Sequence, residues 1–547
     1  MMCRFTITHP ERTVPMTRTA AWLACLLLTT APALAAEVTV TGKVYQERDG
    51  KPGRGPTDPG MAGVQVSNGE VIVRTAADGS YSLPVRDGQT VFVIKPDEYR
   101  FPAASNGLPS YWRHYAPQGS PRLKYDGIRA TGSNVRNWDF ALEPAKGSDA
   151  ARAGFEMLVF TDSQTASRQD IDYYQRAIVD PIIGKHPARL GTTLGDIVND
   201  DLDLYPTINK ATALLQVPWF HVPGNHDLDF DAGDDRHSLD SWRAVYGPDT
   251  YAVEEGGASF VFLDDVVYDP AAKPSYVGGL RPDQLTFLGN YLKGLPRDRL
   301  VVLGMHIPLF DAAPGRETFR HADRTRLFEM LKVFPNVLVL SGHSHTQQHY
   351  YHGAAEGWQG SKPLHEYNVG AACGAFWSGV KDSSGIPDAT MSDGTPNGYA
   401  VLSVKPGGDY GLRYYVARAP DDYQIALHAP KVLRKDAYPA WGVYANVFMG
   451  QADTLVEYRV DSGAWQSMKR VEQPDPRLLV ENVADDQAER LRGFDRSPEA
   501  TPSPHLWRGA LPTNLAAGEH KVEVRAVHAD GPTASASTSY RLQVGKP

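Results

Sequence analysis

The chain has 547 residues, of which 64 are acidic and 55 basic, so its formal net charge at pH 7 is −9. With 42% hydrophobic and 22% charged residues, its composition is that of a folded globular protein rather than a disordered chain. The acidic balance argues against broad binding to nucleic acids or anionic membranes, which requires a positively charged surface. At about 150 residues per domain, the length predicts three or four domains.

The start of the chain predicts an export signal. Residues 20–28 form a short apolar run that Arg18 precedes, and small residues follow at 33–36. This order is typical of a cleaved secretory signal, here residues 1–36, so we expect a periplasmic or secreted protein. The run is too short to span roughly 30 Å of hydrocarbon, and no transmembrane segment is expected elsewhere. The mature chain would keep one cysteine, Cys373, expected to be a small buried apolar residue.

Three folded regions are predicted after the signal. Residues 37–145 predict a small β-sandwich, because short segments rich in β-branched and aromatic residues alternate with turn signals. Within it, residues 63–85 resemble transthyretin-like sandwiches. Residues 151–418 alternate strand-like and helical segments, which predicts an α/β core. Residues 423–547 return to β signals and predict a second sandwich.

Apolar runs and helical spacing locate the expected elements of the α/β core. Strand-like runs occur at residues 157–160, 217–220, 260–263, 300–303 and 337–340. Helical spacing occurs at residues 171–183, 282–295 and 323–333.

Side chains that can bind metal ions follow five apolar strands of this region. Because ligands of α/β sheets bind beyond the carboxyl ends of strands, we expect the five places to converge in space. In chain order the residues are Asp162 and Gln164; Asp196, Asn199 and Asp200; Asn225, His226 and Asp227; His306; and His343 and His345.

The residue types predict a centre of two divalent cations. Imidazole and carboxylate ligands together favour zinc, iron or manganese over calcium. Two ions about 3.5–4 Å apart need a shared bridging group, and a carboxylate can fill this role. In an extended strand end, His343 and His345 would face one side and could reach different ions. Gly195, Gly224 and Gly342 each precede one of these residues and permit close backbone turns.

This order of motifs resembles the calcineurin-like metallophosphoesterase family over roughly residues 155–366. The family pattern is Asp-x-His, Gly-Asp, Gly-Asn-His-Asp/Glu, a lone His and Gly-His-x-His. The resemblance implies an α/β/β/α sandwich catalytic domain. Residues 377–387 and 391–399 further resemble an exported subgroup in which two small all-β sandwich domains flank that domain. For the metals, the resemblance implies that Asp162 and His345 bind one ion, that Asn225, His306 and His343 bind the other, and that Asp196 bridges them.

The same resemblance implies roles for the remaining residues. His226 would donate a proton to the leaving oxygen or hold the phosphate, with Asp227 as its possible orienting partner. Gln164 stands where the family usually has His; its amide oxygen is kept as a weaker ligand that favours manganese or iron. Asn199 stands where some relatives place a carboxylate that supports the catalytic His, and Asp200 is a possible substitute. Asn199, Asn225 and His226 are the predicted substrate-binding residues.

The predicted function is hydrolysis of phosphate mono- or diesters. A hydroxide that bridges two Mn, Fe or Zn ions would attack phosphorus, and His226 would act as general acid. The expected substrate is a small-molecule or a glycan- or lipid-linked phosphoester, with no nucleic-acid partner; the oligomeric state stays open. The two sandwiches and Gln164 leave one alternative, a metal-binding scaffold or surface-binding protein with little catalysis. Metal analysis separates the two, because an empty site favours the scaffold.

Overall fold

The computed structural model describes residues 37–48, 50–51, 53–145, 154–311, 315–438, 441–528 and 533–545. The predicted signal at residues 1–36 lies outside the described residues, so the signal and the export that it implies stay predictions. Among the helices of the described ranges, every one is too short or too polar to cross a bilayer.

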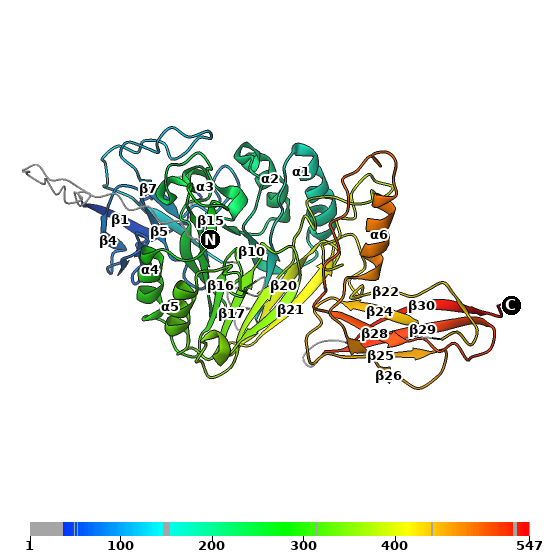
Figure 1. Ribbon diagram of the computed structural model, residues 1–547. Helices are drawn as coiled ribbons and strands as arrows, with labels where there is room; N and C mark the ends of the chain where they lie inside the picture. The colour runs from blue at the N-terminus through cyan, green and yellow to red at the C-terminus, as the bar shows by residue number, and fades with distance from the viewer. Residues whose placement is uncertain are drawn as a thin grey trace, which may run out of the picture. The chain divides into compact units, whose positions relative to one another are not determined.

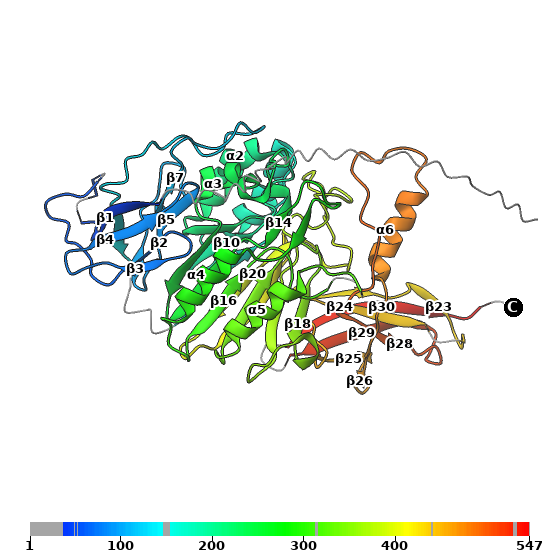
Figure 2. The ribbon, with the colours of Figure 1, turned by 60° about the vertical axis from the view of Figure 1, so that its left-hand side comes forward.

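Two four-stranded sheets form the region between residues 38 and 144 (Figures 1 and 2). The strand orders are β4-β1-β8-β6 and β3-β2-β5-β7. Along β4, Tyr81, Leu83 and Val85 are buried and their neighbours are not, which is the alternation expected of a strand with one face on a core. Residues 116–139, between β7 and β8, contain no helix or strand. The bounds are β1 (Val38–Gln46), β2 (Gln65–Ser67), β3 (Ile72–Arg74), β4 (Ser80–Val85), β5 (Gln89–Val93), β6 (Tyr99–Arg100), β7 (Trp112–Tyr115) and β8 (Phe140–Pro144).

Two mixed sheets form the central region. The first has the order β11-β10-β9-β20-β21, in which β9, β10 and β11 are parallel. Its strands are β9 (Phe155–Phe160), β10 (Ala188–Leu194), β11 (Trp219–Val222), β20 (Gly398–Val404) and β21 (Tyr410–Val416). The second has the order β12-β13-β16-β17-β19-β18, with β13, β16, β17 and β19 parallel. Its strands are β12 (Thr250–Glu255), β13 (Ala258–Leu263), β16 (Leu300–Gly304), β17 (Val337–Ser341), β18 (Gln348–His352) and β19 (Leu364–Asn368), beside a hairpin of β14 (Val266–Tyr268) and β15 (Tyr276–Gly278).

The two central sheets pack face to face, and helices cover their outer faces (Figure 1). Phe220 of β11 stacks on Phe262 of β13 with ring centroids 6.1 Å apart. This arrangement confirms the predicted α/β/β/α sandwich. The helices are α1 (Arg168–Tyr174), α2 (Tyr205–Thr212), α3 (Asp240–Tyr246), α4 (Pro282–Leu292) and α5 (His321–Leu331). Short turns of other helical types are η2 (Gln175–Val179), η3 (Asp180–Ile182), η4 (Leu202–Leu204), η5 (Ala213–Leu215), η6 (Asn225–Asp227), η7 (Asp235–His237) and η8 (Ala354–Glu356).

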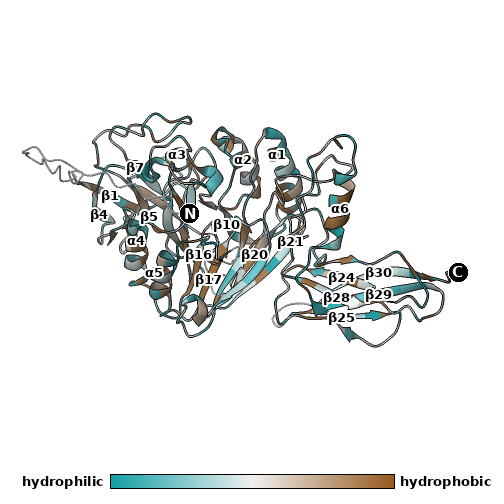
Figure 3. Ribbon diagram, in the orientation of Figure 1, coloured by the Kyte–Doolittle hydropathy of each residue, from teal (hydrophilic) through white to brown (hydrophobic). Residues whose placement is uncertain are grey.

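A further pair of sheets forms the C-terminal region. The orders are β22-β24-β28-β27 and β23-β30-β29-β25-β26. Figure 3 shows hydrophobic colouring along β16 and β17, and every residue of these two strands is buried. Along β29 and β30 polar residues are frequent, and burial alternates along β29. The bounds are β22 (Ile425–His428), β23 (Val432–Arg434), β24 (Gly442–Val447), β25 (Leu455–Val460), β26 (Gln466–Ser467), β27 (Lys469–Arg470), α6 (Pro476–Asp486), β28 (Leu506–Ala510), β29 (Gly518–Val527) and β30 (Ala534–Gln543).

The N-terminal sandwich and the central sheets share one hydrophobic core. Tyr111, just before β7, packs on Phe220 and Tyr251 with ring centroids 6.1 and 5.7 Å away. Lys95 Nζ lies 2.8 Å from Glu255 Oε2, and both side chains are buried. The C-terminal sandwich has its own core around residues such as Val443 and Val524. The domain boundaries near residues 145 and 423 stay predictions.

The buried imidazole of His114 generates a test of this shared core. His114 Nε2 donates to Arg243 O at 2.9 Å, and Thr90 Oγ1 lies 2.8 Å from Nδ1. Burial, with the nearby Arg243 charge, lowers the pKa of His114 from 6.5 to about 3. Between pH 6.5 and about pH 3, His114 is protonated in the unfolded chain but not in the folded chain. The free energy of unfolding therefore falls as the pH drops below about 6.5.

We expect the free energy of unfolding to fall by about 2 kcal/mol more in the wild type than in His114→Gln between pH 7 and pH 5. Urea unfolding at the two pH values measures this difference. Equal pH dependence in the two proteins would contradict a buried, neutral His114.

Candidate metal centre

The loops after five strands meet at one place, where the carboxyl edges of the two central sheets lie together. Backbone hydrogen bonds join them: Asp162 N donates to Gly195 O at 3.1 Å, and Gln164 N donates to Asp196 O at 2.8 Å. From the second sheet, Gly342 N donates to His306 O at 2.9 Å. The structure thus brings together the residues that the sequence singles out as ligands.

Asp196 lies at the centre of this cluster and is buried. Its Oδ1 accepts from His226 N at 2.8 Å, and its Oδ2 accepts from Gln164 Nε2 at 3.2 Å. His306 Nε2 lies 3.3 Å from Oδ2. Ligand atoms of Asp196, His306 and His343 all lie within 4.8 Å of one another, a spacing that one cation can span.

The ring of His306 is oriented from behind. Its Nδ1 donates to Leu194 O at 2.9 Å, so Nε2 faces the cluster, 3.1 Å from Asn225 Oδ1. The buried carboxylate of Asp265 accepts from the backbone N–H groups of His306 and Ile307 at 3.0 and 2.9 Å. A backbone carbonyl on the far nitrogen is a common support for a metal-binding histidine.

Asp162 and His345 form the other half of the cluster. His345 Nε2 lies 3.4 Å from Asp162 Oδ1, and the Asp162 carboxylate also accepts from His343 N at 3.0 Å and from the Thr161 hydroxyl. Cys373 is fully buried, as predicted, but its Sγ lies 3.9 Å from His345 Nδ1, beside two predicted ligands.

Gln164 is oriented differently from a metal ligand. Its amide nitrogen faces Asp196, while Oε1 lies 3.7 Å from Cys373 Sγ. Binding of a cation through Oε1 requires the amide group to turn over. Its role as a ligand stays a prediction.

Left-handed backbone conformations are concentrated in these loops. Such conformations are unfavourable for residues other than glycine, and they persist where surrounding contacts impose them. The prediction that His343 and His345 continue an extended strand is wrong, because β17 ends at Ser341 and both residues have positive φ. The site residues with positive φ are Asp162 (47°), Gln164 (41°), Asp196 (50°), Asp200 (63°), His343 (68°) and His345 (47°).

Two glycines make room for the carboxylates. A Cβ on Gly224 would lie 2.2 Å from Asp196 Oδ1, and a Cβ on Gly342 would lie 2.6 Å from Asp162 Oδ2. Any side chain at these positions would displace a predicted ligand. Glycine is therefore required here by the lack of space for a Cβ, and not only by the close backbone turn that the sequence predicts.

Opposite charges compensate one another inside the cluster. Burial disfavours charge on Asp196, but His306 and His226 outweigh it and hold the pKa of Asp196 below its usual range. Burial also opposes protonation of His306, yet Asp196 and Asp162 raise its pKa to about 10. Burial beside His306 lowers the pKa of His343 to about 4, so that imidazole is neutral at pH 7. Buried carboxylates need such positive neighbours, and divalent cations can take that place.

His226 is supported by Asp200, not by Asp227. His226 Nδ1 lies 2.8 Å from Asp200 Oδ1, and its side chain is 27% exposed. Asp227 instead accepts hydrogen bonds from Gly224 N, Ile197 N, the Tyr205 hydroxyl and Val198 N, at 2.9, 3.2, 3.0 and 3.5 Å. The expected orienting role of Asp227 is therefore corrected: this buried carboxylate fastens the loops after β10 and β11 to each other.

Asn199 contributes a backbone hydrogen bond to this region. Its N–H donates to Thr165 O at 3.1 Å. Its role in substrate binding, like that of Asn225 and His226, stays a prediction.

Sequence reasoning missed Asp265 and the neighbourhood of Cys373. Asp265 follows the apolar run 260–263, so the same signal that located Asp162 could have located it. Cys373 follows no such run; it reaches the site because its N–H donates to Asp162 O at 3.0 Å.

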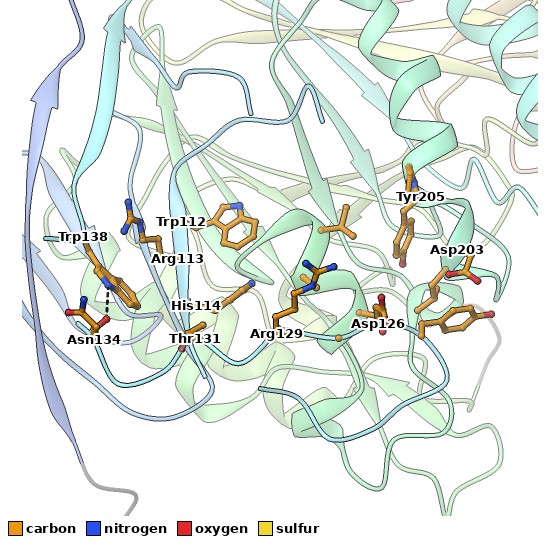
Figure 4. A pocket seen from close by; sticks show the side chains of 18 residues that line it. Trp112, Arg113, His114, Asp126, Arg129, Thr131, Asn134, Trp138, Asp203 and Tyr205 are labelled. Carbon is orange, nitrogen blue, oxygen red and sulfur yellow. Dashed lines mark hydrogen bonds between the residues drawn. The ribbon is translucent and has the colours of Figure 1, made fainter. Parts of the chain in front are cut away.

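A cleft of about 850 Å³ lies between the N-terminal sandwich and the central region (Figure 4). Its lining includes Trp112, Arg129, Asp203 and Tyr205, which Figure 4 labels, and also Tyr125. The described residues that line it include none of the predicted metal ligands.

Three family models match the chain in succession. They describe the N terminal of calcineurin-like phosphoesterase (residues 48–126), calcineurin-like phosphoesterase itself (158–347) and the C terminal of calcineurin-like phosphoesterase (366–533). The chain belongs to the calcineurin-like phosphoesterase family. The predicted family is thereby confirmed, including its subgroup with added N- and C-terminal regions.

Individual relatives are distant. A probable glycerophosphodiester phosphodiesterase from Arcobacter nitrofigilis is 27% identical over 164 residues, which are 28% of this chain. The chain spans about half, 54%, of the length of that curated relative. Among solved structures, a dimetal phosphatase from Danio rerio is 15% identical, with a TM-score of 0.33 over 48% of this chain and 99% of its own. A purple acid phosphatase from yellow lupin (Lupinus luteus) is 10% identical, with a TM-score of 0.37 over 70% and 72%.

The residues present fit the divalent metal ions that the calcineurin-like phosphoesterase family implies. Two carboxylates, three imidazoles and the Asn225 oxygen converge, and His306 presents Nε2 to the cluster because its Nδ1 is engaged. Asp196, His306 and His343 would hold one ion together with Asn225, and Asp162 with His345 would hold the other. Mixed nitrogen and oxygen donors suit zinc, iron or manganese.

Replacement of the central carboxylate tests this assignment. We expect Asp196→Asn to weaken metal binding more than about 100-fold, since even changes outside the ligand set commonly cost 10- to 100-fold. Metal analysis of the protein purified with manganese measures the loss. Asp203→Asn, at an exposed carboxylate of the cleft, is the matched control and should retain wild-type metal content. Equal metal content in all three proteins would contradict the central position of Asp196.

Proposed function

We propose that this chain hydrolyses phosphate mono- or diesters at a centre of two divalent metal ions, with His226 as the proton donor. The observation that carries the proposal is the convergence of Asp196, His306 and His343 within 4.8 Å, with His226 joined to Asp196 through its backbone. Membership of the family supports a phosphoester hydrolase. The mechanism and the substrate are our inference.

The chemistry requires a nucleophile, charge stabilisation and a proton for the leaving group. Divalent ions bound here would lower the pKa of a water molecule and stabilise the charge that develops on the phosphoryl oxygens. The role of the protein is to hold those ions close together. Asp196, in the loop after β10, lies between Gln164 of the first central sheet and His306 of the second. Asn225, with His226 beside it, would contact the phosphate.

His226 has the environment of a proton donor. Burial lowers its pKa, but the hydrogen bond with Asp200 and the charge of Asp196 outweigh this and raise the pKa above its usual value. The raised pKa favours the imidazolium form, which is the form that can donate a proton. Because Nδ1 is engaged by Asp200, Nε2 is the atom that would give its proton to the departing oxygen.

The substrate class rests on the comparisons and the site together. The relative from Arcobacter nitrofigilis is described as a probable glycerophosphodiester phosphodiesterase, which makes small phosphodiesters the first substrates to assay. Turnover of 4-nitrophenyl mono- and diesters by the manganese-loaded protein tests the proposal. A protein that turns over neither ester would contradict the proposal, and an empty metal site in that protein would favour the scaffold.

The role of His226 has its own test. We expect His226→Gln to retain bound metal and to lower kcat for an alkyl ester by about 10²-fold or more, because general acid catalysis commonly contributes that much. His321 is the matched control: it is exposed and lies 3.0 Å from Asp311, in a surface His–Asp pair of the same kind. His321→Gln should leave kcat unchanged. A His226→Gln protein with a wild-type kcat on an alkyl ester would contradict the assignment.

A further inference from the structure

The hydrogen bond between Asp200 and His226 depends on contacts that come from outside the loop of Asp200. The Asp200 side chain is 54% exposed and its backbone is left-handed, with φ of 63°. Its N–H donates to His226 O at 3.2 Å, and this is a long hydrogen bond. An exposed carboxylate on such a backbone has several alternative orientations in water, so its contact with the imidazole needs further support.

That support comes from the N-terminal sandwich. The Tyr125 hydroxyl donates to the backbone carbonyl of Asp200 at 2.7 Å. The backbone N–H of Lys124 donates to Asp231 Oδ2, also at 2.7 Å. Asp200 lies in the loop after β10, and Asp231 follows His226 in the connection after β11, so two adjacent residues of one segment contact both connections.

The segment that carries Tyr125 is itself well fastened. It is part of residues 116–139, which have no helix or strand, yet Ser120 N donates to Ile128 O at 2.8 Å and Thr131 N donates to Ala116 O at 2.9 Å. Ile128 N also donates to Ser120 Oγ at 2.8 Å. These hydrogen bonds close the loop around Tyr125, which lines the cleft.

The direction of the Tyr125 hydroxyl is set by its neighbour. Lys124 Nζ lies 2.7 Å from Tyr125 Oη. An ammonium group can only donate, so the tyrosine oxygen accepts from Lys124 and its own hydrogen is left for the Asp200 carbonyl. A phenylalanine at position 125 would fill the same space and lose only this connection.

We propose that Tyr125 is a positioning residue for His226 and acts through Asp200, so that the N-terminal sandwich completes the catalytic apparatus. This inference rests on the proposed role of His226 as the proton donor. Tyr125 keeps Asp200 where its carboxylate meets Nδ1, and Asp200 keeps the imidazole aimed at the leaving oxygen.

Leaving groups of different basicity test the proposal. A 4-nitrophenolate departs without protonation, whereas an alkoxide needs a proton from His226. We expect Tyr125→Phe to lower kcat for an alkyl ester about 5- to 10-fold, which is the usual contribution of one hydrogen bond. For a 4-nitrophenyl ester that differs from it only in the leaving group, we expect kcat to fall less than about 2-fold. Asp200→Asn should show the same selectivity, and metal content should match the wild type in both variants.

Tyr81→Phe is the matched control, because the Tyr81 hydroxyl donates to a backbone carbonyl, that of Trp138, at the same 2.7 Å within the sandwich. It should change stability without changing the ratio of the two kcat values. Equal losses on both esters, no loss on either, or a loss of metal in Tyr125→Phe would overturn the role of Tyr125. If His226→Gln itself treats the two esters alike, the failure lies with the proposed proton donor.

Discussion

The buried carboxylate of Asp196 is the constraint on which the site depends. A carboxylate out of water is costly unless donors and positive charges surround it. Here those groups come from the loops after β9, β11 and β16: Gln164 Nε2, His226 N and His306 Nε2. Three separate strands must therefore end in register with β10. The face-to-face packing of the two sheets makes this possible, because it places two carboxyl edges side by side.

Residues at the ends of apolar strands were the predictable part of the site. Asp162, Asp196 and His306 each follow a run of buried residues, and the alternation of strands and helices predicts where such runs lead. The conformation of the turns was not predictable in this way. His343 and His345 adopt left-handed backbones, and the His343 N–H donates to the carboxylate of Asp162, 181 residues away; the two-residue spacing contains no record of this. The same limit explains why Asp200, rather than Asp227, proved to be the partner of His226.

The fold shows a similar division. Periodicity predicted an α/β core, and the family resemblance added the α/β/β/α class. The insertion of β20 beside β9 was not predictable, since these strands lie more than 200 residues apart in the chain. Nor does any local pattern indicate that Lys95 meets Glu255 in a buried ion pair. Each group would be read as a surface charge by its residue type alone. Their pairing exists only because two regions with separate sequence patterns fold around one core.

The shared core also limits how this architecture can be recombined. Tyr111 packs on Phe101 of the first region and on Phe220 and Tyr251 of the central one, so its contacts belong to both regions. A chimaera with the first sandwich of another protein would need an aromatic surface that matches Phe220 and Tyr251. It would also need an ammonium group in the place of Lys95, because Glu255 would otherwise keep only its ion pair with Arg189. The C-terminal sandwich closes around its own apolar residues, but Phe448 and Met449 belong to the shared core, and His505 Nε2 lies 3.2 Å from the buried Asp393 Oδ2 of the central region. Exchange of either sandwich would therefore require a replacement that reproduces these contacts with the central region.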